Sequence, residues 1–123
     1  MAEQTAWKGE ILKGKESKIQ KEIIDAINGT GLGRCWVATS GLLKSPDGKR
    51  FVRALPEGFP DLFGYRKADG KMFFIEVKTA SGRVSQSQIN FMKTEVSPKV
   101  LYGIARSIDD AFEILGYEQG KIL

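Results

Sequence analysis

Histidine is absent from this sequence of 123 residues. Histidine is the commonest metal ligand in proteins and the usual general base near neutral pH. Its absence therefore excludes Ser-His-Asp hydrolases, zinc enzymes that use histidine ligands, and nucleases with an essential histidine. Any hydrolysis by this chain must rest on carboxylates, lysine and a metal ion that prefers oxygen ligands.

Cysteine is almost as scarce, because Cys35 is the only one. A single thiol excludes both an internal disulfide framework and a zinc site built from several cysteines. Its position beside Trp36 and Val37 predicts a small buried core residue.

Long apolar runs are also missing, since no stretch approaches the roughly 20 apolar residues that span a bilayer. Residues 1–15 mix charged and apolar side chains, so they lack the continuous apolar block of a secretory signal. We therefore expect no membrane partner and a cytoplasmic location.

The composition fits one soluble domain over residues 1–123, with 41% hydrophobic and 28% charged residues. The net charge of +4 favours a polyanionic partner such as nucleic acid, although an ordinary basic surface has the same charge. No glycine-rich phosphate-binding motif of the Walker type is present, so we expect no nucleotide cofactor.

Hydrophobic periodicity predicts a mixed α/β domain with one sheet. Ile19, Ile23, Ile24 and Ile27 recur at helical spacing and predict a helix over 16–28 that stops at Asn28-Gly29. Strands are expected over 34–39, 50–55, 61–65, 71–78 and 99–105. Further helices are expected from residue 85 and over 107–115, with Ser107 as the N-cap.

Turn and cap residues predict how these elements connect. Ser45-Pro46-Asp47-Gly48 suits a turn that joins the strands over 34–39 and 50–55 in a hairpin. Ser85 and Gln88 have the spacing of a capping box, ahead of an apolar stripe made of Ile89, Met92 and Val96.

Two short segments carry the chemistry: GFPDL over 58–62 and IEVKT over 75–79. Side chains alternate along a strand, so Glu76 and Lys78 share one face. A two-residue turn at Asp69-Gly70 sets Asp61 opposite Lys78 and diagonal to Glu76, about 5 Å and about 7–8 Å away. This convergence depends on the turn, because a slip of one residue would scatter the charges.

Two carboxylates held so close repel each other, and a divalent cation with oxygen ligands relieves that repulsion. Asp61 and Glu76 therefore predict a site for Mg²⁺ or Mn²⁺, where a phosphate ester can be hydrolysed. Lys78 can orient the attacking water, assist its deprotonation or stabilise the transition state. The alternative is a surface strand on which Glu76 and Lys78 are merely solvated.

Two further polar residues have two interpretations each. Glu16 shares a helical face with Ile19, Ile23 and Ile27, so it can be a third acidic member of the metal site or a first-turn Glu favoured by the helix dipole. Gln88 can contact substrate or metal-bound water, but the capping box is the stronger physical explanation.

Taken in order, these motifs resemble the VRR-NUC domain, a branch of the PD-(D/E)XK nucleases, over about residues 16–112. The resemblance rests on Glu16-Ser17, Gly58-x-Pro60-Asp61, the IEVKT segment with Gly82, and Ser85 with Gln88. It implies a restriction-endonuclease-like mixed sheet flanked by helices and a DNA nuclease dependent on Mg²⁺ or Mn²⁺.

The resemblance also implies a role for each motif residue. It implies metal binding by Asp61, Glu76 and the backbone carbonyl of Val77, with Lys78 as the catalytic lysine. It adds Glu16, as a further metal ligand, and Gln88 to the site.

Stand-alone chains of this size resemble phage or prophage proteins, which implies the cytoplasm of a bacterial cell or of an infected host. Their similarity to Holliday junction resolvases implies a homodimer that cuts branched DNA, since paired nicks need two sites. We expect its interface on an exposed apolar patch, with Trp7, Phe51, Val52 and Leu55 as candidates.

Other functions compete with the resolvase hypothesis. One is a DNA-binding module of the same fold that does not cut, and another is a flap or single-strand nuclease. A hydrolase of small phosphate esters is the third, but scattered basic residues suit an extended DNA backbone better. Those residues are Lys44, Lys49, Arg50, Arg53, Arg66, Lys67 and Arg83.

Overall fold

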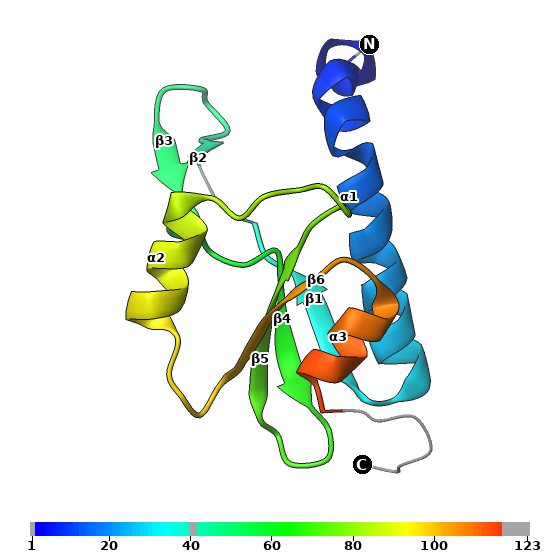
Figure 1. The fold of residues 1–123 in the computed structure, drawn as a ribbon. Helices are drawn as coiled ribbons and strands as arrows, with labels where there is room; N and C mark the ends of the chain where they lie inside the picture. Colours follow the sequence, from blue (N-terminus) through cyan, green and yellow to red (C-terminus); the bar gives the residue numbers. More distant parts are fainter. Residues whose placement is uncertain (1, 40–41, 117–123) are drawn as a thin grey trace.

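The computed structural model describes residues 2–39 and 42–116, with side chains from residue 14 onward. In chain order the elements are α1 (Ala2–Thr30), β1 (Gly33–Val37), β2 (Leu42–Lys44), β3 (Phe51–Arg53), β4 (Leu62–Arg66), β5 (Met72–Val77), α2 (Gln86–Glu95), β6 (Leu101–Ala105) and α3 (Ile108–Ile114). Four strands form a mixed sheet in the order β1-β4-β5-β6, in which only β5 and β6 are parallel. Strands β2 and β3 form a separate two-stranded ribbon (Figure 1).

Helices α1 and α3 cover one face of the sheet and α2 lies on the other (Figure 1). The core lies mainly between the sheet and helices α1 and α3, where Ile23 and Ile27 of α1 lie in one cluster with Phe73, Ile75 and Val77 of β5. Every residue of β5 except Met72 is buried, which explains its nearly continuous hydrophobic sequence. This is the α/β architecture that the sequence predicts. Among the helices that the structure describes, none is long and apolar enough to cross a membrane.

Aromatic side chains attach α2 to the second face of the sheet. Phe91 of α2 meets Phe59 and Phe74 with ring centroids 5.1 and 6.0 Å apart, each pair edge to face. Phe91 is buried whereas Met92 is 39% exposed, so the predicted place of Met92 in the apolar stripe is wrong, while Ile89 and Val96 are half-buried. An aromatic ring buries more apolar area than a thioether, which favours Phe91 over Met92 at the buried position.

Helix α1 is longer than the predicted helix over 16–28 and passes through Asn28 and Gly29. The left-handed residue that ends it is Gly31, with φ of 75°. The Asn28 side chain instead pairs with the backbone of Cys35, accepting from its N–H at 2.9 Å and donating to its carbonyl at 3.2 Å. The side-chain amide thus satisfies backbone groups on the outer edge of β1. Cys35 is a buried core residue, as predicted.

The predicted hairpin between the strands over 34–39 and 50–55 is wrong. Strand β1 pairs with β4, and the turn at Ser45–Gly48 joins β3 to β2, a strand that the sequence pattern did not reveal. All residues of β2 and β3 are exposed. The strand expected over 50–55 is present as β3, whereas β2 has no buried face and lacks the alternation of apolar and polar residues from which strands are recognised.

The register between β4 and β5 differs by two residues from the prediction. Leu62 pairs with Ile75 and Tyr65 with Met72, while the Arg66 N–H donates to the Lys71 carbonyl, so the connection is longer than a two-residue turn. Its shape is fixed by Asp69, which accepts two hydrogen bonds from the Arg66 guanidinium. A shift of two residues keeps each side chain on its predicted face, because strand side chains alternate with a period of two.

Candidate metal centre

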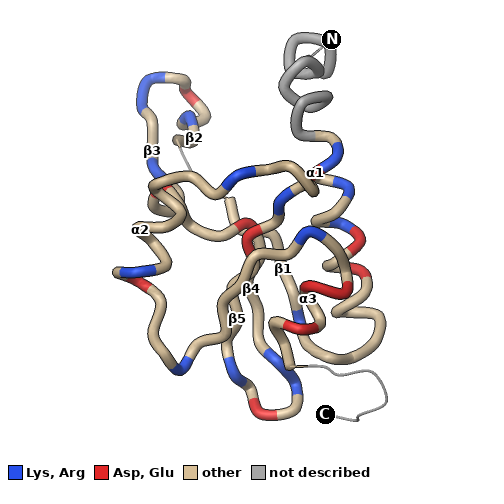
Figure 2. Tube along the Cα trace, in the orientation of Figure 1, with Lys and Arg blue, Asp and Glu red and all other residues tan. Residues whose placement is uncertain are grey.

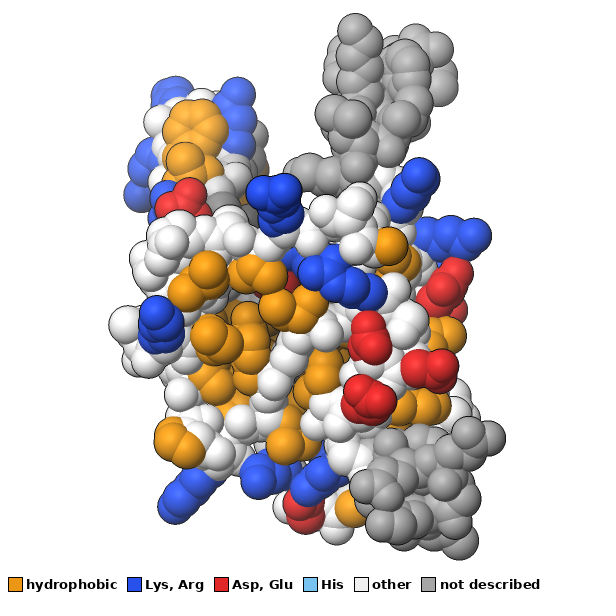
Figure 3. Space-filling view, viewed as in Figure 1, with side chains coloured by type: hydrophobic (Ala, Val, Ile, Leu, Met, Phe, Trp, Pro, Cys, Tyr) orange, Lys and Arg blue, Asp and Glu red, His pale blue; other side chains and the backbone are white. Residues whose placement is uncertain are grey.

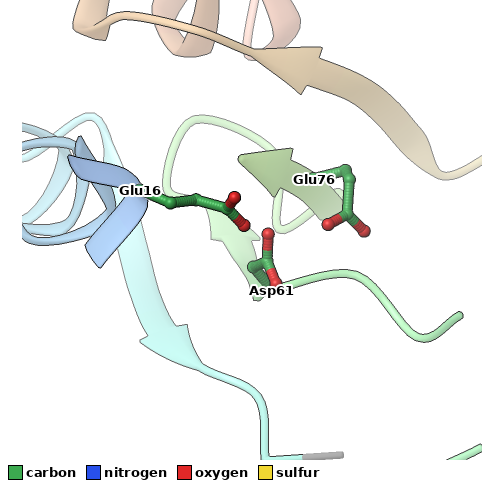
Figure 4. Close-up of side chains that lie close together, drawn as sticks. All are labelled: Glu16, Asp61 and Glu76. Carbon is green, nitrogen blue, oxygen red and sulfur yellow. The ribbon is translucent and has the colours of Figure 1, made fainter. Parts of the chain in front are cut away.

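Three carboxylates meet at one end of the sheet. Asp61 directly precedes β4, and one step beyond the Leu62–Ile75 pair the register places it opposite Glu76 rather than Lys78. Glu16 reaches the same place from α1 (Figure 4). One carboxylate oxygen from each of the three lies within 4.8 Å of the others, and we call this group the acidic cluster.

Asp61 is held by the strands on both sides of it. Its Oδ2 accepts a hydrogen bond of 2.8 Å from the Val77 N–H, and its backbone carbonyl accepts one of 2.8 Å from the Ala38 N–H. The carboxylate therefore has a fixed orientation and keeps a second oxygen for another partner. Hydrogen bonds of this kind hold metal ligands in a fixed orientation in proteins.

Glu76 is the most unusual member of the acidic cluster because it is fully buried. Neither of its carboxyl oxygens accepts a hydrogen bond from a donor among the residues that the structure describes. Burial raises the pKa of Glu76 well above its ordinary range, the adjacent Asp61 raises it further, and Lys78 partly offsets the rise. A buried acid without a partner is costly, and a cation beside it would remove that cost.

Glu16 lies in the middle of α1, so the positive end of the helix dipole cannot explain its position. It is half-buried, and its negative charge contributes to the raised pKa of Glu76. Of the two interpretations of Glu16, the structure supports membership of the acidic group. Three oxygen donors and no soft ligand form a set that suits a hard divalent cation.

Lys78 follows β5 directly, and its backbone N–H donates to the Ala105 carbonyl at 3.0 Å. The residue is half-buried, and its positive charge partly offsets the rise in the pKa of Glu76. The catalytic role that the E-x-K spacing predicts for Lys78 stays a prediction.

Comparison with protein families matches the VRR-NUC domain over residues 14–107. The chain belongs to the VRR-NUC family. The matched segment includes the whole acidic cluster, Lys78 and Gln88. No curated protein matches the chain. Membership of this family gives the chain a restriction-endonuclease-like fold and a nuclease-type function with DNA as the partner.

Two residues predicted for the VRR-NUC site each use one polar group in a hydrogen bond within the protein. The Gln88 side-chain oxygen accepts from the Ser85 N–H at 2.8 Å, which completes the predicted capping box of α2. The Val77 N–H is bonded to Asp61, while metal binding by the Val77 carbonyl remains a prediction. Site roles for Gln88 and Val77 therefore rest on the resemblance.

The structure adds residues that the sequence did not single out. Tyr102 of β6 lies close enough to Glu76 and Asp61 that their charges, after burial, raise its pKa. The Arg106 guanidinium donates to the carbonyls of Thr79 and Gly82, which fixes the loop after Lys78. Neither residue belongs to a local motif, so only the pairing of β6 with β5 could have revealed them.

Gly58 has a structural reason for its place before Pro60-Asp61. Its φ is 82°, and a Cβ there would lie 2.2 Å from the Ser87 carbonyl oxygen in the first turn of α2. Only glycine allows the segment that leads into Asp61 to pass so close to the helix. Gly58 thus helps to set the path of the backbone that places Asp61 in the acidic cluster.

Proposed function

We propose that this VRR-NUC chain is a nuclease that uses Mg²⁺ or Mn²⁺ to hydrolyse phosphodiester bonds in DNA. The observation that supports the proposal best is the buried Glu76 carboxyl, which lacks a protein partner among the described residues and lies beside Asp61 and Glu16. A carboxyl whose burial costs so much free energy is typical of a functional site.

Each residue of the proposed site has a distinct task. Asp61, Glu76 and Glu16, with the Val77 carbonyl, would hold the cation. The cation supplies Lewis-acid chemistry, which lowers the pKa of water and offsets charge that builds up on phosphorus. Lys78 orients the attacking water, assists its deprotonation or stabilises the charge of the transition state.

We place Gln88 at the edge of this site only as a polar contact to substrate or water. Its oxygen already serves the α2 cap. Substitution of Gln88 would therefore disturb the helix start as well as any contact to DNA, and it does not test the site.

The decisive experiment is a divalent-metal titration with four-way, flapped and linear DNA of equal length. We expect cleavage in Mg²⁺ or Mn²⁺, none in chelator, and near-complete loss in folded Asp61→Ala, Glu76→Ala and Lys78→Ala. Glu22→Ala is the matched control, because Glu22 is an exposed carboxylate on the same helix as Glu16. Undiminished turnover in EDTA would refute the metal-dependent mechanism.

The same titration distinguishes the substrate classes. We propose that branched DNA is preferred and that a homodimer cuts it, in the cytoplasm of a bacterial cell or of a phage-infected host. Preference for flaps or single strands would support the alternative nuclease. Metal-dependent DNA binding without cleavage would instead support a DNA-binding module.

We place the proposed dimer interface on the sheet rather than on the β2–β3 ribbon. Trp36, Tyr65 and Met72 are each about two-fifths exposed on the face that also carries α2, and the rings of Trp36 and Tyr65 are 6.1 Å apart. Of the earlier candidates, Phe51 and Val52 lie on the ribbon and Leu55 is half-buried. The Trp7 side chain lies outside the described residues.

A further inference from the structure

The β2–β3 ribbon, residues 42–53, emerges at the end of the sheet that carries the acidic cluster. It is inserted between the end of β1 and the start of β4, and Figure 1 shows it projecting from the body of the molecule. The hydrogen bond from the Ala38 N–H to the Asp61 carbonyl closes the base of this insertion. A molecule that lies on the acidic cluster is therefore within reach of the ribbon.

Both faces of the ribbon expose hydrophobic side chains. The strand pairs are Leu42 with Arg53, Leu43 with Val52 and Lys44 with Phe51. Phe51 is 65% exposed, the most of any large hydrophobic residue among those the structure describes. An isolated two-stranded ribbon is marginally stable in water, and exposed apolar groups of this kind mark binding surfaces.

The ribbon is also strongly basic. Lys44, Lys49, Arg50 and Arg53 are all exposed, and Asp47 is its only acid. The Asp47 carboxylate accepts hydrogen bonds from the Ser45 hydroxyl at 2.6 Å and the Lys49 N–H at 2.9 Å, so it stiffens the turn. Figure 2 shows the basic positions along the projecting ribbon, and Figure 3 shows basic side chains there beside exposed hydrophobic ones.

The arrangement on one face combines two kinds of contact. Lys44, Phe51 and Arg53 share that face, because Lys44 pairs with Phe51 and Arg53 is two residues further along β3. Cations bind phosphates irrespective of sequence, and an exposed aromatic ring stacks on bases whose faces are uncovered. In a linear duplex those base faces are covered, whereas opening of a branch point unstacks the terminal base pairs of its arms and uncovers them.

We propose that the β2–β3 ribbon is a DNA-binding arm. Its lysines and arginines contact phosphates on the arms of the substrate, and Phe51 stacks on a base left unstacked at the branch. The proposal rests on the nuclease function above. It explains how the nuclease would bind branched DNA in preference to a linear duplex. A second copy of the chain is the competing occupant, but a two-fold contact between ribbons would bring like charges together.

The test measures binding by the full chain in a cleavage-defective Lys78→Ala background. The probes are a four-way junction with 2-aminopurine at the branch and a linear duplex of equal length. We expect Phe51→Ala to weaken junction binding about 10-fold, to abolish the fluorescence change at the branch and to leave duplex binding nearly unchanged. Phe51→Trp should restore both junction signals.

Charge variants test the phosphate contacts separately. Lys44→Gln and Arg53→Gln should weaken binding to both DNAs and each reduce the salt slope by about one. Met92→Ala is the control, since Met92 is an exposed apolar residue outside the ribbon. Unchanged thermal midpoints in these variants would show that the fold is intact.

Two results would overturn the proposed arm. One is junction binding by Phe51→Ala that equals that of the parent. The other is conversion of a dimer to a monomer by Phe51→Ala without DNA, which would assign the ribbon to contact between copies. Absence of metal-dependent cleavage by the wild-type chain would refute the nuclease proposal alone, because ribbon binding is measured without turnover.

Discussion

At the scale of single residues, Glu76 shows how the site conflicts with stability. The strand that carries it is buried for packing reasons, and the carboxyl is buried with it. Burial and the adjacent Asp61 raise the pKa of Glu76, so the folded protein binds this proton more tightly than the unfolded chain does. Replacement of such a functional group usually stabilises a protein.

We predict that Glu76→Gln stabilises the metal-free protein and removes much of its pH dependence. In the wild type, protonation of Glu76 contributes to the free energy of unfolding. This contribution is fully present below the ordinary pKa of 4.5 and is lost as pH rises toward the higher folded-state pKa. In chelator, the thermal midpoint should therefore fall from pH 5 to pH 8 in the wild type more than in Glu76→Gln. At pH 8 we expect the free energy of unfolding of Glu76→Gln to exceed that of the wild type by at least about 1 kcal/mol. Parallel pH profiles would contradict this account of Glu76.

Glu16 gives a second prediction at the same scale. Glu16→Gln keeps the shape of the side chain but removes one charge from the acidic cluster. We expect the Mg²⁺ concentration that gives half-maximal cleavage to rise about 10-fold or more. Glu22→Gln, an exposed change on the same helix, should leave it unaltered. Equal effects of the two substitutions on the half-maximal Mg²⁺ concentration would contradict the assignment of Glu16 to the site.

At the scale of elements, the segment before β4 links the site to helix α2. Phe59 packs edge to face on Phe91 of α2, and Gly58 passes against the Ser87 carbonyl. Asp61 follows two residues after Phe59 and is bonded to the backbone of β5. The position of α2 and the orientation of the Asp61 carboxylate are therefore coupled through a few backbone atoms.

We predict that Gly58→Ala lowers the free energy of unfolding by about 1–3 kcal/mol and reduces cleavage as well. Gly70→Ala is the matched control, because Gly70 also has positive φ, at 72°, but an added Cβ meets nothing within 4 Å. The control should be milder and should leave turnover per folded molecule unchanged. Denaturant unfolding and single-turnover cleavage measure the two effects. Equal stability losses would show that the contact with Ser87 is unimportant.

At the scale of the whole molecule, one site per chain limits what a monomer can do. A chain of this size can cut one strand at a time, whereas resolution of a four-way junction needs two symmetric nicks. The exposed sheet face around Trp36 and Tyr65 carries large apolar side chains together with Arg34, whose guanidinium lies 5.6 Å from the Trp36 ring centroid, and it belongs to a different sheet from the charged ribbon. These properties favour separate surfaces for self-association and for DNA.

We predict that light scattering at micromolar concentration reports about twice the chain mass. Trp36→Glu should give a monomer that nicks junctions without paired cleavage, because a buried charge opposes the contact. Met92→Glu places the same charge on exposed α2 and should remain dimeric. A strict monomer that still makes paired nicks would refute the proposed assembly.

The sequence by itself determined the chemistry and the class of fold. The absence of histidine limited the site to oxygen ligands and lysine, and alternation along IEVKT put Glu76 and Lys78 on one face. Both inferences depend only on residue type and on the period of a strand. Family membership then confirmed the mixed α/β fold and a nuclease-type function.

Only the tertiary structure decided which groups meet. It places Glu76, rather than Lys78, opposite Asp61 and brings Glu16 to them from the middle of α1. It also leaves the Glu76 carboxyl buried without a hydrogen-bond donor among the described residues. It also separated β2 and β3 from the main sheet. Turn length, helix extent and burial arise from contacts between segments distant in the chain, and local periodicity carries no record of those contacts.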